Sequence, residues 1–274
     1  MNSFFDIYYN ESKKTFCYRS KDLVYEERFE KGALMPCGWN ASGYPLDVLT
    51  NFPSRLDTRR YTEPFAFNLE IDGQSVSYDL DFVSFEKEET DNSLLCRLTL
   101  KSNIKPLEIT VCTLLDGSQM FSRWLEIKNL SDKPLCVNKL VLISGGFEDM
   151  DTDHLKGTND KSALYSLGYF DDDSWGREGQ FRWRSLNPDT TAIDGRFLRD
   201  RFRHPIIFLK NNVMGHIWFC QIGYSGGYRF SIDYNAKPYK DESHLSFKAE
   251  ITGHSPVLVL KPFEEFTTPE AHIG

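Results

Sequence analysis

Apolar side chains recur at every second position in two neighbouring stretches, Leu94-Leu-Cys-Arg-Leu-Thr-Leu100 and Leu107-Glu-Ile-Thr-Val-Cys-Thr-Leu114. The residues between them, Asn103-Ile-Lys-Pro106, include the turn formers asparagine and proline. A period of two is typical of a β-strand that buries one face, because successive side chains of a strand point to opposite sides. The pattern therefore predicts an antiparallel hairpin with one buried face.

The same rhythm of strands and turns continues on both sides of this hairpin. Asp116-Gly117 predicts the next reversal and Phe121–Asn129 the next strand. A turn at Ser131-Asp-Lys-Pro134 then leads into a strand at Leu135–Ile143. Further strands are predicted at 64–71 and 76–85, on either side of a turn at Asp72-Gly73, and at 206–210, 214–223, 227–234, 244–251 and 256–261. Many short strands with few or no helices indicate an all-β sandwich or barrel.

Composition and charge restrict the function of this chain. With 274 residues, of which 40% are hydrophobic, it can bury a large core as one big β domain or two smaller ones. The net charge of −8 disfavours nucleic acid and anionic membranes as partners, because both require a basic surface. A neutral ligand is easier to accommodate.

The cysteines and the first residues bear on location. The six cysteines have neither metal-ligand nor disulfide-framework spacing, so reduced thiols are expected. The stretch Met1–Glu11 lacks a basic region followed by an apolar one, and no run of about 18 apolar residues occurs. These observations predict a cytoplasmic protein.

The strand rhythm fades between Gly145 and Arg203, where glycine, aspartate, arginine and aromatic residues dominate. Long irregular segments in compact domains carry function, contain short strands, or are mobile. Trp175 stands among aspartate and arginine residues, which suits a sugar, because a ring face covers apolar C–H groups while charged groups bond hydroxyls. Trp183 is expected to anchor the core instead.

Several apparent motifs are better explained by structure than by chemistry. Gly223-Tyr-Ser-Gly-Gly227 fits a serine-nucleophile pattern, but strands are predicted on both sides, so a hairpin turn is expected. Asp149-Met-Asp-Thr-Asp153 lacks the glycine and glutamate of a calcium loop. Asp171-Asp172-Asp173 is typical of a solvated charge run. No metal site or cofactor is predicted, and the sequence selects no catalytic carboxylate pair among its 40 acidic residues.

Trp39 is a second candidate for ligand contact. It lies in Cys37-Gly-Trp-Asn-Ala-Ser-Gly-Tyr-Pro45, a glycine-rich stretch that is predicted to form a loop. An exposed ring in such a loop could reach a ligand. The alternative is that the ring caps the edge of the sandwich.

Stretches spread along most of the chain resemble, in order, the amino-terminal domain of family 36 glycoside hydrolases, the α-galactosidase-like enzymes. They are Tyr44–Pro53, Pro64–Phe67, Asp72-Gly73, Phe121–Leu135, Trp175–Glu178, Pro205–Leu209, Ile217–Ile232 and the closing stretch Pro262–Gly274, which contains Thr268-Pro-Glu270. The closing stretch is similar to the segment that precedes the catalytic barrel in that family.

The resemblance implies a single antiparallel β-supersandwich, of the galactose-mutarotase-like kind, over residues 1–274. It also implies a following (β/α)8 barrel, absent from this chain, that carries both catalytic aspartates of a retaining α-galactosidase. No catalytic residue is therefore assigned here. Trp175 corresponds to a tryptophan that packs on the sugar, an α-galactoside or related glycan. The family's domain also helps to build an oligomer, commonly a tetramer, so a homo-oligomer is expected.

The chain departs from the family pattern at three places. These are Arg55–Pro64, the arginine-rich stretch Leu198–His204, and a loop that is much shortened around Pro36–Gly43. Trp39 could fill the space that the shortened loop leaves. The departures leave the preferred sugar open.

Two other classes of protein remain open at this point. One is a free-standing carbohydrate-binding module. The other is an enzyme in its own right, such as a supersandwich aldose epimerase, which requires a histidine and a glutamate over a sugar pocket.

Overall fold

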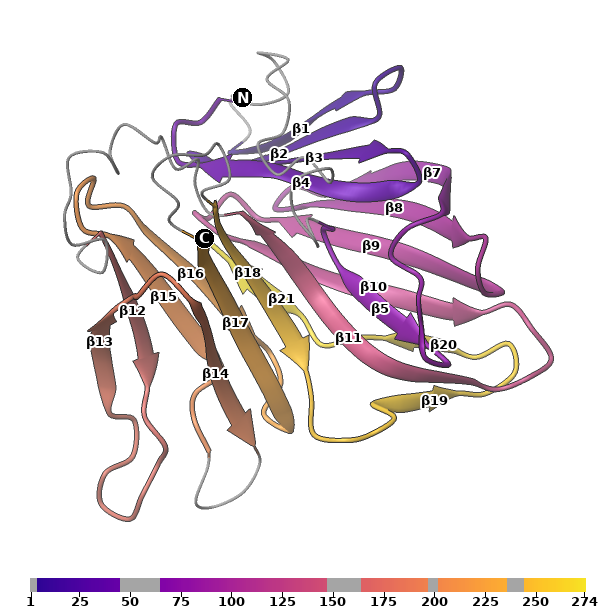
Figure 1. Ribbon diagram of the computed structural model, residues 1–274. Coiled ribbons are helices and arrows are strands. Elements are labelled where there is room, and N and C mark those ends of the chain that lie inside the picture. The colour runs from indigo at the N-terminus through magenta and orange to yellow at the C-terminus, as the bar shows by residue number, and fades with distance from the viewer. Residues whose placement is uncertain (1–3, 45–64, 147–163, 197–201, 236–243) are drawn as a thin grey trace.

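The computed structural model describes residues 4–44, 65–146, 164–196, 202–235 and 244–274. Within these ranges the regular elements are β-strands, arranged in three antiparallel sheets (Figure 1). The all-β prediction is therefore confirmed. No helix in the described ranges is long and apolar enough to cross a membrane.

The predicted hairpin forms as the alternation indicates. β8 (Leu94–Ser102) pairs antiparallel with β9 (Leu107–Leu115), and Leu98 lies opposite Val111. Alternate side chains of β8 are fully buried, and those between them are half-buried or exposed. One face of the hairpin therefore packs on the core.

The ten-stranded sheet has the order β13-β12-β15-β16-β21-β10-β9-β8-β7, and β20 pairs with β10 beside β21. Its other strands are β7 (Leu80–Glu89), β10 (Phe121–Asn129), β12 (Tyr165–Phe170), β13 (Phe181–Ser185), β15 (Ile206–Asn211), β16 (Ile217–Ile222), β20 (Glu265–Thr267) and β21 (Ala271–Ile273). The edge strands of this sheet are β13 and β7.

Two smaller sheets complete the domain. The four-stranded sheet consists of β1 (Phe5–Asn10), β2 (Thr15–Ser20), β3 (Leu23–Glu30) and β4 (Ala33–Asn40), in that order. The seven-stranded sheet has the order β14-β17-β18-β11-β5-β6, with β19 also on β11. Its strands are β5 (Asn68–Ile71), β6 (Gln74–Ser75), β11 (Leu135–Gly146), β14 (Thr190–Arg196), β17 (Gly227–Asn235), β18 (His244–Ile251) and β19 (Leu258–Leu260).

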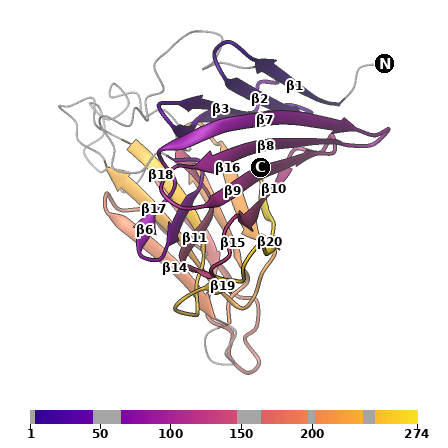
Figure 2. The same cartoon turned by 90° about the vertical axis from the view of Figure 1, so that its right-hand side faces the viewer.

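One hydrophobic core connects all three sheets. The ten-stranded and seven-stranded sheets meet where the rings of Tyr165 in β12 and Tyr234 in β17 pack edge to face, with centroids 5.4 Å apart. The four-stranded sheet lies over the β7 to β10 end of the ten-stranded sheet (Figures 1 and 2). There the ring of Tyr25 packs 5.1 Å from that of Phe121.

A buried ion pair joins the four-stranded sheet to the ten-stranded sheet. Arg123 of β10 donates to the two carboxylate oxygens of Glu27 in β3, at 2.9 and 2.6 Å, and these side chains are only 1% and 0% exposed. Tyr18 also donates to Glu27, at 2.9 Å, and Arg123 donates to Tyr25 and Thr113. Burial alone would lower the pKa of Arg123, but the Glu27 carboxylate raises it above its ordinary value. The guanidinium therefore stays charged.

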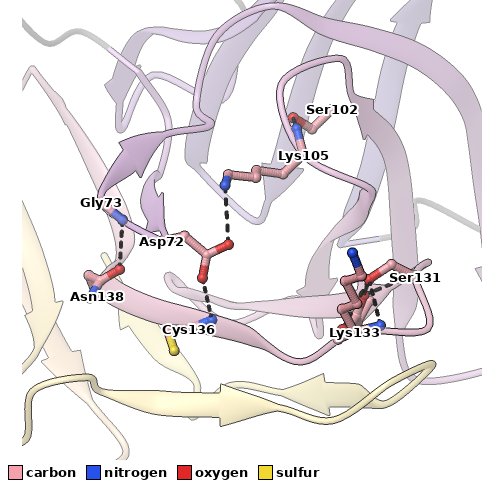
Figure 3. A network of polar contacts seen from close by, with 9 residues as sticks. Asp72, Gly73, Ser102, Lys105, Ser131, Lys133, Cys136 and Asn138 are labelled. Carbon is pink, nitrogen blue, oxygen red and sulfur yellow. Dashed lines mark hydrogen bonds and ion pairs between the residues drawn. The ribbon is translucent and has the colours of Figure 1, made fainter.

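Asp72 fixes the tight turn between β5 and β6 (Figure 3). Asp72 and Gly73 have positive φ angles of 49° and 75°, as a two-residue hairpin turn requires, and the Asp-Gly turn is confirmed. The Asp72 carboxylate accepts a hydrogen bond from the Cys136 backbone N–H at 2.9 Å and pairs with Lys105 Nζ at 3.1 Å. The Gly73 N–H donates to Asn138 Oδ1 at 2.9 Å. These contacts tie the turn to β11 and to the β8–β9 turn.

The structure corrects the predictions for both Trp183 and Trp39. Trp183 is not a core anchor: it lies in β13 and is 43% exposed, because β13 is an edge strand whose five residues all reach solvent. The backbone of Trp39 lies in β4, opposite Tyr25, and not in a loop. β4 continues to Asn40, with a shift in the β3–β4 register beside Gly38, and residues 41–44 lie beyond the end of the strand.

Other local predictions have different outcomes. In its described residues, the irregular segment from Gly145 contains the strands β12, β13 and β14, which confirms that it contains short strands. A turn does connect β16 to β17 at 223–226, but those strands belong to different sheets, so the hairpin expected there is wrong. The aspartates at 149–153 lie outside the described residues.

Candidate functional site

The loop between β12 and β13 places Trp175 at its tip. The Arg177 N–H donates to the Ser174 carbonyl at 2.8 Å, which closes a four-residue turn with Trp175 in second position. Gly176, in third position, has a φ of 73°, which side-chain-bearing residues rarely adopt. Trp175 is 89% exposed. The turn therefore presents nearly the whole indole to solvent.

The three consecutive aspartates predicted to be a solvated charge run brace this loop. Asp171 pairs with Arg182 of β13, and Asp172 pairs with Arg203 Nε at 2.6 Å. Asp173 Oδ1 accepts a backbone N–H from within the loop at 2.8 Å. Across the described ranges, no three His, Cys, Asp or Glu side chains are grouped to hold a metal ion.

The seven-stranded sheet holds Arg203 and His204, which contact the β12–β13 loop, through a side chain of β17. The Tyr228 hydroxyl, from β17, lies 3.2 and 3.1 Å from the carbonyl oxygens of Arg203 and His204. Burial raises the pKa of Tyr228, so the hydroxyl remains a hydrogen-bond donor. Gly195 of β14 lies opposite Tyr228, and a Cβ there would stand 2.2 Å from the ring. A glycine at this position is what leaves room for Tyr228.

A backbone hydrogen bond and aromatic packing link residues 202–204 to the β12–β13 loop and its flanking strands. The Asp173 N–H donates to the Phe202 carbonyl at 2.8 Å. The His204 ring packs on Phe170, 4.7 Å away, and on Phe202, 5.7 Å away. Phe170 in turn packs edge to face on Phe181, at 5.3 Å. The position of Trp175 is thus set by both large sheets.

The exposed Trp175 and its charged neighbours are suited to binding a ligand rather than to cleaving a bond. An exposed indole covers the apolar face of a sugar, and neighbouring charged side chains bond its hydroxyls. Arg177 and Glu178 are exposed beside Trp175. Asp171 and Asp172 are engaged with arginines.

The structure also brings together Ser122, His272 and Glu270, which the sequence analysis did not select. Ser122 Oγ lies 2.8 Å from His272 Nδ1, and His272 Nε2 lies 3.8 Å from Glu270 Oε2. Ser122 and His272 face each other across β10 and β21, so their backbones are held in a sheet ladder. A nucleophilic serine instead needs a sharp turn and free N–H donors for an oxyanion. The group is therefore a cross-strand polar contact.

The backbones of the two sequence-predicted site residues lie in different parts of the fold. Trp175 lies in the β12–β13 loop of the ten-stranded sheet, and the backbone of Trp39 lies in the four-stranded sheet. Sequence reasoning missed Tyr228 and Gly195, whose roles depend on pairing between strands that are distant along the chain. No sequence signal pointed to Gly195, because the alternation of apolar residues fades between Gly145 and Arg203.

A scan against protein-family models found no match, and a search of curated proteins likewise found none. Solved structures do share the fold. The α-galactosidase AgaB from Geobacillus stearothermophilus, a family 36 glycoside hydrolase, is similar over 98% of this chain and 40% of its own, with 17% identity and a TM-score of 0.69. The α-galactosidase from Lactobacillus brevis is similar over 98% of this chain and 40% of its own, with 15% identity and a TM-score of 0.73.

A more distant likeness is to the α-N-acetylgalactosaminidase NagBb from Bifidobacterium bifidum, with 10% identity and a TM-score of 0.53 over 100% of this chain. The chain spans about 40% of the length of the α-galactosidases that it matches. The resemblance to family 36 is therefore confirmed at the level of the fold, which is one that these enzymes contain as part of a longer chain.

Proposed function

We propose that this chain is the non-catalytic amino-terminal domain of a retaining α-galactosidase-like glycoside hydrolase. The observation that carries the proposal is the shared fold, which covers nearly all of this chain but well under half of the α-galactosidases. The resemblance implies that a (β/α)8 barrel follows this domain in such an enzyme. Hydrolysis of terminal α-galactosides would then take place on a barrel that joins this domain.

Within this proposal, Trp175 shapes the substrate pocket by packing on the sugar, and Trp39 is a second candidate for contact. The exposure of Trp175 at the tip of a braced turn supports its role. Structural neighbours include family 36 α-galactosidases crystallised with raffinose and with stachyose. We also propose that the domain helps to form a homo-oligomer. A cytoplasmic location is also proposed, because the spacing of the six cysteines is not that of a disulfide framework.

The test is hydrolysis of nitrophenyl α-galactoside by this 274-residue chain, beside any longer product of its reading frame. We expect activity in the longer protein only. Trp175→Ala in that protein should lower kcat/KM by about tenfold or more, since it removes a contact to the sugar worth at least about 1.4 kcal/mol.

Tyr8→Ala is the matched control, because Tyr8 is an exposed ring, 51% accessible, in the distant strand β1. It should leave kcat/KM unchanged. Hydrolysis by the 274-residue chain alone would refute the assignment of a non-catalytic domain. An unchanged kcat/KM in Trp175→Ala would refute the role of that residue.

A further inference from the structure

The outer face of the ten-stranded sheet carries a row of aromatic rings near its β13 edge. Trp183 of β13, Gly168 of β12, Phe208 of β15 and Phe219 of β16 lie opposite one another in register. Phe181 lies two residues before Trp183, on the same face, because alternate residues of a strand share a face. Phe181 and Trp183 are 41% and 43% exposed. Rings on a sheet face that solvent reaches are candidates for a binding surface.

Gly168 determines how these rings lie. A Cβ on Gly168 would stand 2.7 Å from the Phe181 ring and 3.0 Å from the Trp183 ring. Both rings therefore lean over bare backbone in β12. Phe181 packs edge to face on Trp183 and on Phe208, with centroids 5.5 and 5.6 Å apart, which holds the indole in place. The surface is thus preorganised, with Trp183 supported from beneath and open to solvent.

A polar row runs directly beside the aromatic row. Ser166 of β12 lies opposite Ser185 of β13 on one side and Lys210 of β15 on the other. The Asn212 amide donates to Ser166 Oγ at 3.0 Å, which adds a side-chain carbonyl and amide at the end of this row. The two rows are about 7 Å apart, since two residues along a strand rise about 3.4 Å each.

We propose that this surface, formed by Trp183, Phe208, Ser166, Ser185 and Asn212, binds a neutral oligosaccharide separately from the Trp175 loop. Sugars have apolar C–H faces bordered by hydroxyl groups, so one unit can cover the Trp183 ring while its hydroxyls bond the polar row. A wholly apolar partner would instead bury the polar row without hydrogen bonds, at a cost in free energy.

A second copy of this chain does not fit the β13 edge. In antiparallel pairing of two β13 strands centred on Trp183, Arg182 of each strand would lie opposite Arg184 of the other. Like charges directly opposite each other destabilise a strand pair. Arg182 and Arg184 thus disfavour pairing of β13 with a second copy of the chain. The aromatic row beside this edge remains exposed to solvent.

The test uses native electrophoresis of the 274-residue chain in gels that contain guar galactomannan, with dextran as the comparison polysaccharide. The inference rests on the proposed function only for the choice of a galactose-bearing probe. We expect retardation by galactomannan, weakened about fivefold or more in Trp183→Ala, which corresponds to about 1 kcal/mol. Gly168→Ala should also weaken it, because the new methyl group displaces both rings.

Control variants distinguish binding at this surface from binding at the Trp175 loop and from loss of folding. Tyr8→Ala should be retarded like the parent chain, and Trp175→Ala should lose less retardation than Trp183→Ala. The thermal unfolding of Trp183→Ala should match that of Tyr8→Ala. Absence of retardation in the parent chain, or retardation that survives Trp183→Ala, would overturn the proposal. So would a doubled mass in sedimentation that Trp183→Ala abolishes, because the surface would then be a contact between copies. None of these outcomes bears on hydrolysis by the longer enzyme or on its loss in Trp175→Ala.

Discussion

Arg123 and Glu27 show at the scale of single residues how this chain tolerates charge in its interior. Each guanidinium N–H that faces Glu27 has a carboxylate oxygen to bond, and Tyr18, Tyr25 and Thr113 supply further polar contacts. Moving two charges out of water costs free energy, and this cost is offset only when the charges are paired and hydrogen-bonded in this way. We therefore expect the pair to help fix the position of the four-stranded sheet on the ten-stranded sheet.

Removing one partner of this pair should destabilise the protein strongly. Arg123→Met leaves the Glu27 carboxylate buried without its counter-ion, and we expect a loss of about 3 to 5 kcal/mol in the free energy of unfolding. Urea unfolding followed by far-UV circular dichroism measures the loss. Arg229→Met is the matched control, because Arg229 pairs with Asp194 at the exposed surface, where such a pair contributes about 0 to 1 kcal/mol. Equal losses in the two variants would contradict this account.

At the scale of elements, short polar contacts hold turns against strands of other hairpins. The β5–β6 turn is the clearest case, because Asp72 joins it to β11 and to Lys105 (Figure 3). The pKa of Asp72 is lowered, first by the hydrogen bond from the Cys136 N–H and then by Lys105, and burial opposes this only in part. A carboxylate whose pKa is lower in the folded state stabilises the protein above its unfolded pKa.

Asp72→Asn should therefore lose stability in a pH-dependent way. At pH 7 the variant should be less stable than the parent chain, since the ion pair with Lys105 is gone. As the pH falls from the unfolded pKa, about 3.9, through the lowered folded pKa, the parent chain loses the same contribution, so the difference should shrink. Urea midpoints measured from pH 7 to pH 3 test this. A difference that stays constant over that range would show that the charge of Asp72 contributes nothing.

At the scale of the whole molecule, a continuous core makes the three sheets one structural unit. The core includes Phe5 of the four-stranded sheet, Leu98 of the ten-stranded sheet and Ile232 of the seven-stranded sheet. The Arg123–Glu27 pair adds a polar link between two of them. Unfolding of one sheet alone would expose apolar surface on its neighbours, which disfavours partly folded states.

We therefore expect one cooperative unfolding transition. Tryptophan fluorescence and far-UV circular dichroism should give the same urea midpoint, and Arg123→Met should lower both midpoints together. Separate midpoints for the two probes would indicate that one sheet unfolds independently.

The sequence by itself determined the all-β class, the β8–β9 hairpin and the Asp72-Gly73 turn, because alternation and turn chemistry act between residues close along the chain. It also placed Trp175 in a polar, irregular stretch. The exposure of Trp183, the strand position of Trp39 and the support of the Trp175 loop by Tyr228 were decided by the tertiary structure alone. These features depend on which strand lies at a sheet edge and which strands pair across the chain, and period-two patterns are the same for every such arrangement.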